Sequence, residues 1–352
     1  MMAHTLMTRS STTMLAAIPN PLSGMHAIER GFRLMRRMPP DLTEAFRYAF
    51  THLMAACPNN PLDYHQSTAD LRIPLLLQAG LAVAAAVDAD AARRVAARHT
   101  ELAYHNRYHF CEATLAMGWL CAIAYTRGTI SLHQAVLGIV AMVGHDYGHD
   151  GTWDQTGALE ELAANAVAAI AASVGVGSDD RSALRGIVLA TALPAVRANK
   201  ARAAELERAG HCQSGAAAMH LMASEADVLT SLMPSLGCRL GHALAAEWAI
   251  NPGTPPLDPA SFTGRVAFLG LHDYLSDASI ELGLRHMHVS QVMAFRQLAA
   301  SWDQPPLPEA AAAILDQLPP RQATRLFAAA MLQTSRSGPP PISTGPGLFG
   351  EI

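Results

Sequence analysis

Two short polar motifs, each beside an apolar segment, constrain this chain more than any other feature. The first is Tyr-His-Asn-Arg-Tyr-His at 104–109, and the second is His-Asp-Tyr-Gly-His at 145–149. If these segments are helical, the two histidines of each motif share one helix face, because residues four apart are neighbours on a helix. Burying a charged group is costly unless it is paired, so a His-Asp pair that follows the apolar run 141–144 needs a reason to be there. The motifs therefore predict a functional site built from helices.

The composition favours helices throughout the chain. Hydrophobic residues make up 50% of the 352 residues and charged residues only 15%, so a large core can form and global disorder is excluded. The apolar residues are dominated by Ala, Leu and Met, and aromatic residues are only 6%. This balance favours helices over a β-sandwich. Since no strand-period segment of consequence and no internal repeat is present, we predict an all-α, compact multi-helix fold.

The chain divides into four predicted parts. We expect residues 1–20 to be a disordered N-terminus and the Pro/Gly-rich residues 335–352 to be a disordered tail. Residues 21–88 are expected to form helices that pack on the core, and residues 89–334 to form the domain that carries the motifs. The Pro-rich stretch Pro252–Pro259 is the best candidate for a subdomain boundary. We also expect a helix break near Asp88 and unbroken helices over 104–126, 131–145, 216–231 and 260–284.

Charge and cysteine usage predict a cytoplasmic protein that acts on a small molecule. The net charge is −4 and Lys and Arg are scattered, so no surface for polymeric nucleic acid or an anionic membrane is indicated. The five cysteines show no C-x-x-C spacing, which predicts free thiols in a reducing compartment. Residues 1–20 lack a signal-peptide core, and no run of roughly 18 uninterrupted apolar residues is present. An oligomer is allowed but not indicated.

The histidines and aspartates of the motifs form the ligand set of a buried divalent-metal site. Imidazole and carboxylate ligands suit such a cation, and Asp146, beside His145, can bridge two metals because a carboxylate has two oxygens. His109 and Asp227 would complete the protein ligands of the first metal and leave positions open for water and substrate. A metal site of this kind lowers the pKa of bound water toward about 7 and polarises phosphoryl oxygens. The pattern therefore predicts metal-dependent hydrolysis.

The motifs and their order resemble those of the class I cyclic nucleotide phosphodiesterases, which belong to the HD phosphohydrolase superfamily. YHNRYH is similar to their Y-H-N-x-x-H, GHDYGHDG to their H-D-x-x-H-P-G, and EADVLTSLMP to their C-A-D-[LI]-S-N-P. RSALRGIVLATAL resembles the helix that ends in V-L-A-T-D-M, and VSQVMAF resembles S-Q-V-x-F. The resemblance covers roughly residues 90–320. It implies an HD-type phosphodiesterase bundle around a binuclear metal site, in a divergent, bacterial member of the family.

The resemblance implies both the cofactors and the reaction. Zinc would occupy the tight site, and Asp146 would bridge to a magnesium or manganese ion that is otherwise largely water-coordinated. A metal-bridging hydroxide would open a 3′,5′-cyclic nucleotide, cAMP or cGMP, to the 5′-monophosphate, and His105 would act as general acid on the leaving oxygen. The metal ligands implied are His109, His145, Asp146 and Asp227.

The resemblance also implies supporting and substrate-binding residues. Glu161 would orient the catalytic histidine, although the adjacent Glu160 competes for that role. Gln291 would hydrogen-bond a purine edge while a nearby Phe stacks on the ring. The substrate-binding residues implied are Tyr104, Asn106, His149, Gln291 and Phe295. The chain departs from the family pattern at Asp150, Ala192, Thr230 and Ser231, and Phe295 follows Gln291 by four residues instead of three.

Two alternatives stay open on the sequence alone. The metal ligands would equally serve another HD-type phosphohydrolase that acts on a different nucleotide or on a cyclic dinucleotide. A metal-stabilised scaffold or ligand sensor without catalysis is the other alternative. It would require the loss of a catalytic group, yet the metal ligands and His105 are all present.

Overall fold

The protein is all-α, as predicted. The computed structural model describes residues 24–57, 72–98, 100–211, 213–250 and 257–336, and within these residues it holds sixteen α-helices and no strand. The helices are α1 (Met25–Met35), α2 (Leu42–Ala55), α3 (Arg72–Arg98), α4 (Arg107–Thr126), α5 (Leu132–Val143), α6 (Ala158–Ser173), α7 (Ser178–Leu189), α8 (Leu193–Arg208), α9 (Gly215–Asp227), α10 (Leu229–Leu232), α11 (Pro234–Trp248), α12 (Phe262–Leu271), α13 (Asp277–Leu282), α14 (Leu284–Ser301), α15 (Pro308–Gln317) and α16 (Pro320–Arg336).

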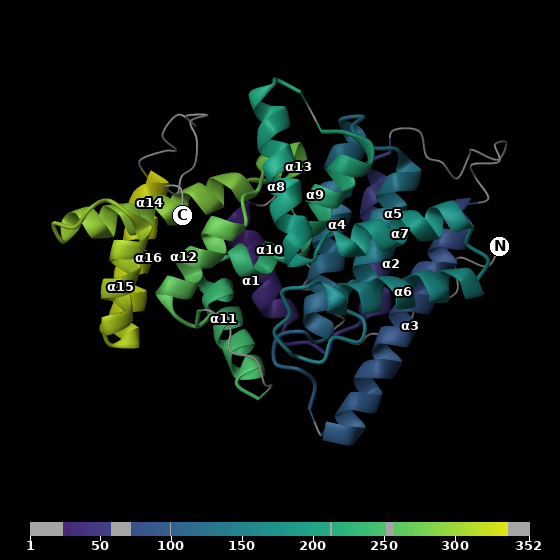
Figure 1. Cartoon of the computed structure of the whole chain (residues 1–352), viewed down its shortest axis with the longest axis horizontal. Coiled ribbons are helices and arrows are strands. Elements are labelled where there is room, and N and C mark those ends of the chain that lie inside the picture. Colours follow the sequence, from purple (N-terminus) through teal and green to yellow (C-terminus); the bar gives the residue numbers. More distant parts are fainter. Residues whose placement is uncertain (1–23, 58–71, 99, 212, 251–256, 337–352) are drawn as a thin grey trace.

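Helix α4 lies at the centre of the molecule (Figure 1). Its residues are buried without interruption from His109 to Ala122, and it packs against α2, α5 and α9. Gly118 allows α2 to approach closely, because a Cβ at this position would lie only 2.7 Å from the Cβ of Ala49. Since neighbouring helices surround α4, the motif at its N-terminal end also lies inside the protein.

The first helix is tied to the centre by buried charged groups. The Arg36 guanidinium, just after α1, donates to both carboxylate oxygens of Glu112 on α4, at 2.5 and 2.7 Å. Glu29 on α1 accepts hydrogen bonds of 2.7 Å from the backbone N–H groups of Ser235 and Leu236 at the start of α11. These contacts join α1 to two helices that carry site residues.

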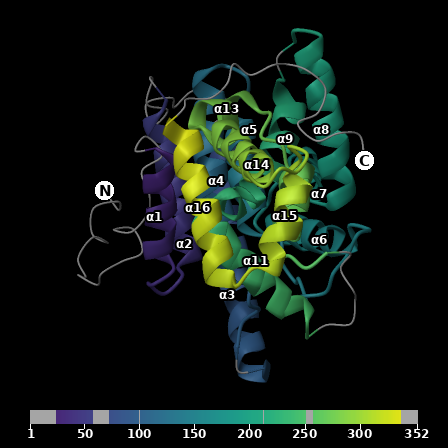
Figure 2. The same ribbon diagram turned by 90° about the vertical axis from the view of Figure 1, so that its left-hand side faces the viewer.

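The last helices form one side of the molecule (Figures 1 and 2). Helix α14 packs against α15 and α16, and α12 packs against α15. An aromatic cluster holds this side together: Phe295 on α14 lies 4.7 Å from Phe327 on α16 and 6.3 Å from Phe262 on α12, measured between ring centroids. The core of these helices is continuous with that around α4.

Several helix limits differ from those predicted. Helix α3 runs through Asp88 without a break, because the Asp88 carboxylate points outward to Arg107, 3.4 Å away, and the flanking residues are Ala-rich. The helix predicted over 216–231 is divided at Val228, and the one predicted over 260–284 is divided between Leu271 and Asp277. Helix α11 was not predicted.

The remaining predictions on organisation are tested only in part. Residues 1–20, most of 335–352 and much of Pro252–Pro259 lie outside the described residues, and the predicted domain limits stay predictions. The four described cysteines are free thiols, whereas Cys212 lies outside the described residues. Among the described helices, the segment Arg72–Ala97 is long and apolar enough to cross a membrane by length and composition, although 39% of its most apolar window is buried, and core helices pass the same test.

Candidate functional site

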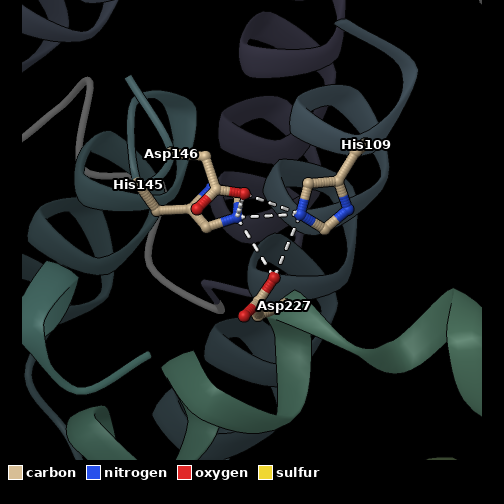
Figure 3. A group of neighbouring side chains, drawn as sticks. All are labelled: His109, His145, Asp146 and Asp227. Carbon is tan, nitrogen blue, oxygen red and sulfur yellow. Dashed lines mark hydrogen bonds and ion pairs between the residues drawn. The ribbon is translucent and has the colours of Figure 1, made fainter. Parts of the chain in front are cut away.

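The four predicted metal ligands converge from three helices (Figure 3). His109 lies in the first turn of α4, His145 and Asp146 follow α5, and Asp227 ends α9. Their ligand atoms all lie within 4.8 Å of one another. His109 Nε2 is 3.0 Å from Asp146 Oδ2 and 3.1 Å from Asp227 Oδ1, and His145 Nε2 is 3.2 Å from each of the same oxygens. The sequence prediction that these residues meet is confirmed.

The end of α5 delivers two of these ligands because Gly144 lets the chain turn there. A Cβ at Gly144 would lie 2.6 Å from a methyl carbon of Val83 and 2.7 Å from one of Val167. With no side chain at this position, α3 and α6 close over the turn, and His145 and Asp146 enter the interior. His145 is fully buried. A larger residue at position 144 would push both ligands out of place.

The donor set fits a divalent cation. His145 Nδ1 lies 3.0 Å from the Met142 carbonyl oxygen, so it carries the ring proton and leaves the lone pair of Nε2 facing the two aspartates. The Nε2 atoms of His145 and His109 lie 3.1 Å apart. Two lone pairs and two carboxylate oxygens that face one point are the arrangement that a cation such as Zn²⁺ binds.

The electrostatics of the cluster show the same demand for positive charge. Burial lowers the pKa of His109, but hydrogen bonds and charges from Asp146 and Asp227 outweigh it and raise that pKa to about 9. The pKa of His145 is raised in the same way. Burial raises the pKa of Asp146 and Asp227, yet their interactions with the two imidazoles hold both pKa values below the usual range. The two carboxylates thus stabilise positive charge at the point that the two imidazoles face.

A second polar cluster lies beside the first and contains His105, His149 and Glu247. His105 Nδ1 is 2.5 Å from Glu247 Oε1, and Oε2 of Glu247 accepts hydrogen bonds from the backbone N–H groups of Tyr104 and His105 at 2.8 and 3.1 Å. The ring of His149 is stacked on that of His105 at 3.7 Å between centroids. The His105 ring also lies 5.7 Å from that of the metal ligand His109. An imidazole paired with a buried carboxylate thus stands next to the metal site.

The charges of this second cluster are set by the protein around it. Burial raises the pKa of Glu247, but hydrogen bonds from His105 and the backbone outweigh it and lower that pKa. Burial, with a contribution from the charge of His105, lowers the pKa of His149 to about 4. The Gly151 N–H donates to His149 Nδ1 at 2.9 Å, so the neutral ring carries its proton on Nε2. The cluster thus contains an ionised carboxylate and a neutral imidazole on either side of His105.

The prediction that His105 and His109 share a helix face is wrong. Helix α4 begins only at Arg107, and Asn106 is its N-cap, with Oδ1 accepting from Tyr108 N at 3.0 Å. His105 therefore belongs to the bend before the helix. His145 and His149 likewise do not share a helix face, because α5 ends at Val143 and a turn follows. The chain geometry before and after the helices, and not the helical repeat, sets the directions of these rings.

The carboxylate on His105 belongs to Glu247 and not to the predicted Glu161. The Glu161 side chain is 47% exposed and pairs with Arg185. The adjacent Glu160 points the other way: its Oε2 is buried, without a hydrogen-bond partner among the described residues. Burial, backed by the charges of Asp146, Asp227 and Asp154, raises the pKa of Glu160 to about 7. Glu247 and Glu160 are thus site residues that the sequence reasoning did not assign.

Two of the predicted substrate-binding residues lie at the motif itself. The Tyr104 ring is buried, 5.0 Å from the His109 ring, and its hydroxyl lies 2.9 Å from Ser231 Oγ. Asn106 uses its side chain locally: besides capping α4, its Nδ2 donates to the carbonyls of Leu102 and Ala103. Asn106, His105, His149 and Asp146 all line one narrow pocket beside the metal ligands.

The predicted base clamp, Gln291 and Phe295, is not available to a substrate. Both side chains have no exposed surface. Gln291 Oε1 accepts from the buried Arg265 guanidinium at 2.5 Å, and its Nε2 donates to the Leu232 carbonyl at 2.7 Å. The prediction fails because Arg265, a buried cation, needs an acceptor in the core, and because Phe295 completes the aromatic cluster with Phe262 and Phe327.

No protein-family model matches the chain, and no curated protein matches it. Among solved structures, the chain is similar to the phosphodiesterase domain of the RhoPDE fusion protein from the choanoflagellate Salpingoeca rosetta. The identity is 13%, the match covers 85% of this chain and 91% of that chain, and the TM-score is 0.41. A likeness this distant does not bear on function, which must be inferred from the residues of the site.

Proposed function

We propose that this chain is a metal-dependent phosphodiesterase that opens a 3′,5′-cyclic nucleotide to the 5′-monophosphate. One observation supports the proposal above the others. A His/Asp cation site and a histidine held by a buried carboxylate lie side by side, with the His105 and His109 rings 5.7 Å apart. Hydrolysis of a phosphodiester needs both parts: activation at phosphorus and a proton for the leaving oxygen.

The cations would be held by residues that match their chemistry. His109, His145, Asp146 and Asp227 would suit a zinc ion, and Asp146 would also be available to a magnesium or manganese ion. The buried, unpartnered oxygen of Glu160 and its acidic neighbours support a place for that second ion on the same side. When bound, divalent cations supply Lewis-acid activation of the phosphoryl group and a hydroxide nucleophile at neutral pH.

His105 would donate the proton to the leaving oxygen. Because its Nδ1–H faces the Glu247 carboxylate, the transferable proton sits on Nε2, and the carboxylate stabilises the imidazolium before transfer. The two backbone N–H groups that bind Glu247 hold this carboxylate in place. His149, which stays neutral, stacks on His105 without adding a competing charge and can donate from Nε2 to the substrate.

A second candidate is a phosphohydrolase that acts on a linear nucleotide or a cyclic dinucleotide. The closed positions of Gln291 and Phe295 favour this alternative, because the expected readers of a purine are not accessible. The metal site and the His105–Glu247 pair would serve these substrates equally well. We also propose a cytoplasmic location and a small soluble substrate, in keeping with the net charge of −4 and the scattered basic residues.

Metal removal and a substrate panel test the proposal. EDTA should abolish hydrolysis of cAMP or cGMP, and Zn²⁺ with Mg²⁺ or Mn²⁺ should restore it. His105→Ala should remove most of the activity while the bound metal, measured by plasma mass spectrometry, is retained. Metal retained with unchanged turnover would refute the role of His105. Clear preference for a deoxynucleoside triphosphate or a cyclic dinucleotide would favour the second candidate.

A further inference from the structure

Two half-buried tryptophans meet at the edge of the candidate site. Trp153 lies in the loop between α5 and α6, and Trp248 is the last residue of α11. Their rings meet edge to face, with centroids 4.7 Å apart and an interplanar angle of 67°. Both side chains are partly exposed. Indole rings bury large flat apolar surfaces, and partial exposure leaves part of that surface free to contact another molecule.

The chain itself places this tryptophan pair close to His105. Trp248 follows Glu247, whose carboxylate binds His105, and Trp153 follows His149, which stacks on His105, by four residues. Four residues span at most about 14 Å, and adjacent Cα atoms lie about 3.8 Å apart. The segment that carries His149 and Trp153 and the segment that carries Glu247 and Trp248 are therefore joined in two ways. Both contact His105, and their two indoles contact each other. The tryptophan pair is therefore connected to His105, which is proposed to protonate the leaving group, by one peptide bond from Glu247 and by four residues from His149.

The proposed reaction leaves a need for such a surface. The oxygen that receives the proton from His105 is attached to the sugar of the nucleotide, which carries the base. The residues predicted to hold that base, Gln291 and Phe295, are buried in the core. Nucleobases stack on aromatic side chains, and tryptophan offers the largest ring face. The other two tryptophans do not qualify, since Trp119 is fully buried and Trp302 lies at the far end of α14.

Building on the proposed phosphodiesterase function, we propose that Trp153 and Trp248 form the subsite that holds the nucleobase of the substrate. The base stacks on the free indole surface while the phosphate lies at the metal ligands. This subsite selects for a nucleotide over a plain phosphodiester and tolerates either purine, because stacking reads a ring face and not a hydrogen-bonding edge.

The test compares two ligands that differ only in the base. Adenosine 5′-monophosphate and ribose 5-phosphate are titrated into the Mn²⁺-loaded full-length protein by calorimetry. The nucleotide should bind more tightly by roughly 5- to 150-fold, the range for stacking of one base. Trp248→Leu and Trp153→Leu, which keep an apolar side chain but remove the ring, should reduce this ratio toward one while ribose 5-phosphate binds as before. Trp248→Phe should restore part of the ratio, and Trp302→Leu, the matched control, should leave it unchanged.

Each other outcome contradicts the subsite. An unchanged ratio in both leucine variants would overturn it while leaving the proposed hydrolysis intact, because turnover of the cyclic nucleotide is measured separately. An equal loss of both ligands would show that the indoles only hold the loop to α11, and would also overturn it. The subsite would also be overturned if the unaltered protein hydrolyses cyclic nucleotides but binds adenosine 5′-monophosphate and ribose 5-phosphate with about equal affinity. If the unaltered protein has no phosphodiesterase activity, the proposed function fails as well.

Discussion

Replacing Glu247 by glutamine separates the two halves of the candidate site. Glu247 is 2% exposed, and its carboxylate forms hydrogen bonds with His105 Nδ1 and with the backbone N–H groups of Tyr104 and His105. Glu247→Gln keeps the size of the side chain but removes its charge. An amide also has only one acceptor oxygen, so it cannot face the imidazole with one acceptor and the backbone with another. The metal ligands are not touched by this change.

The size of the effect follows from the bond that is lost. A hydrogen bond to a charged group is worth roughly 1.5–3 kcal/mol, and about 1.4 kcal/mol corresponds to a tenfold change in rate. The imidazolium of His105 loses this support before it gives up its proton. We therefore expect kcat for a cyclic nucleotide to fall by about 10- to 100-fold. This is less than or equal to the lower limit of the 10²- to 10⁴-fold that general acid catalysis typically contributes, because His105 itself is retained.

The assay compares leaving groups. A cyclic nucleotide expels a basic alkoxide that needs a proton, whereas bis(p-nitrophenyl) phosphate expels a stable phenolate that does not. Glu247→Gln should slow the first substrate by the amount above and the second by less than about threefold, with bound metal unchanged. Glu161→Gln is the matched control, because its exposed carboxylate pairs with Arg185, and it should affect neither substrate. Equal slowing of both substrates, or a larger effect of Glu161→Gln, would refute the assignment of Glu247.

Three further outcomes are expected. In metal-free protein, burial lowers the pKa of His109 and His145, but Asp146 and Asp227 outweigh it, raising the pKa of His109 to about 9 and also raising that of His145. The stability that this adds is complete below the unfolded-state pKa near 6.5 and is lost as the pH rises toward the folded-state pKa. Metal binding, in contrast, needs unprotonated imidazole rings. The melting-temperature gap between metal-loaded and EDTA-treated protein should therefore widen from about pH 6.5 to 9, and a narrowing gap would contradict the metal site. Gln291→Ala should destabilise the fold by roughly 1–3 kcal/mol in urea unfolding, since Arg265 loses its side-chain acceptor although the carbonyls of Ser231 and Leu232 remain. KM should be unchanged, and a raised KM at full stability would support the predicted clamp. Glu160→Gln should reduce the bound divalent cations from two to one, and two cations in that variant would exclude Glu160 from the second site.

Two of the metal ligands, His145 and Asp146, could be predicted because their signal is local. A His-Asp pair at the end of an apolar helix is unusual in itself, since burying it requires a compensating partner. The helical segments around it could be read from composition and periodicity, and the N-caps of α2 and α5, Asp41 and Ser131, have the side chains that capping requires. Functional residues that are adjacent in the sequence can be predicted without knowledge of the structure.

The partners of the site residues could not be predicted because they are joined only by folding. Glu247 lies 142 residues from His105, on a helix with no motif of its own. Glu160 and Glu161 are adjacent in the sequence, and only the packing of α6 decides which of them turns inward. Gln291 matched the family pattern as letters, yet the burial of Arg265 beside it, 26 residues earlier in the chain, directs its amide into the core. A pattern of letters does not specify what a side chain faces.

Asn106 shows how one motif can serve both halves of the site. Asn106 has an extended backbone and caps α4 with its side chain, so the helix begins at the next residue, Arg107. His105, which precedes the cap, therefore lies outside the helix. The His105 and His109 rings consequently lie perpendicular to each other, at 90°, instead of parallel along one face. If α4 began at Tyr104, His105 and His109 would share one helix face. The start of α4, and not the spacing of the two histidines, separates His105 from the cluster around His109.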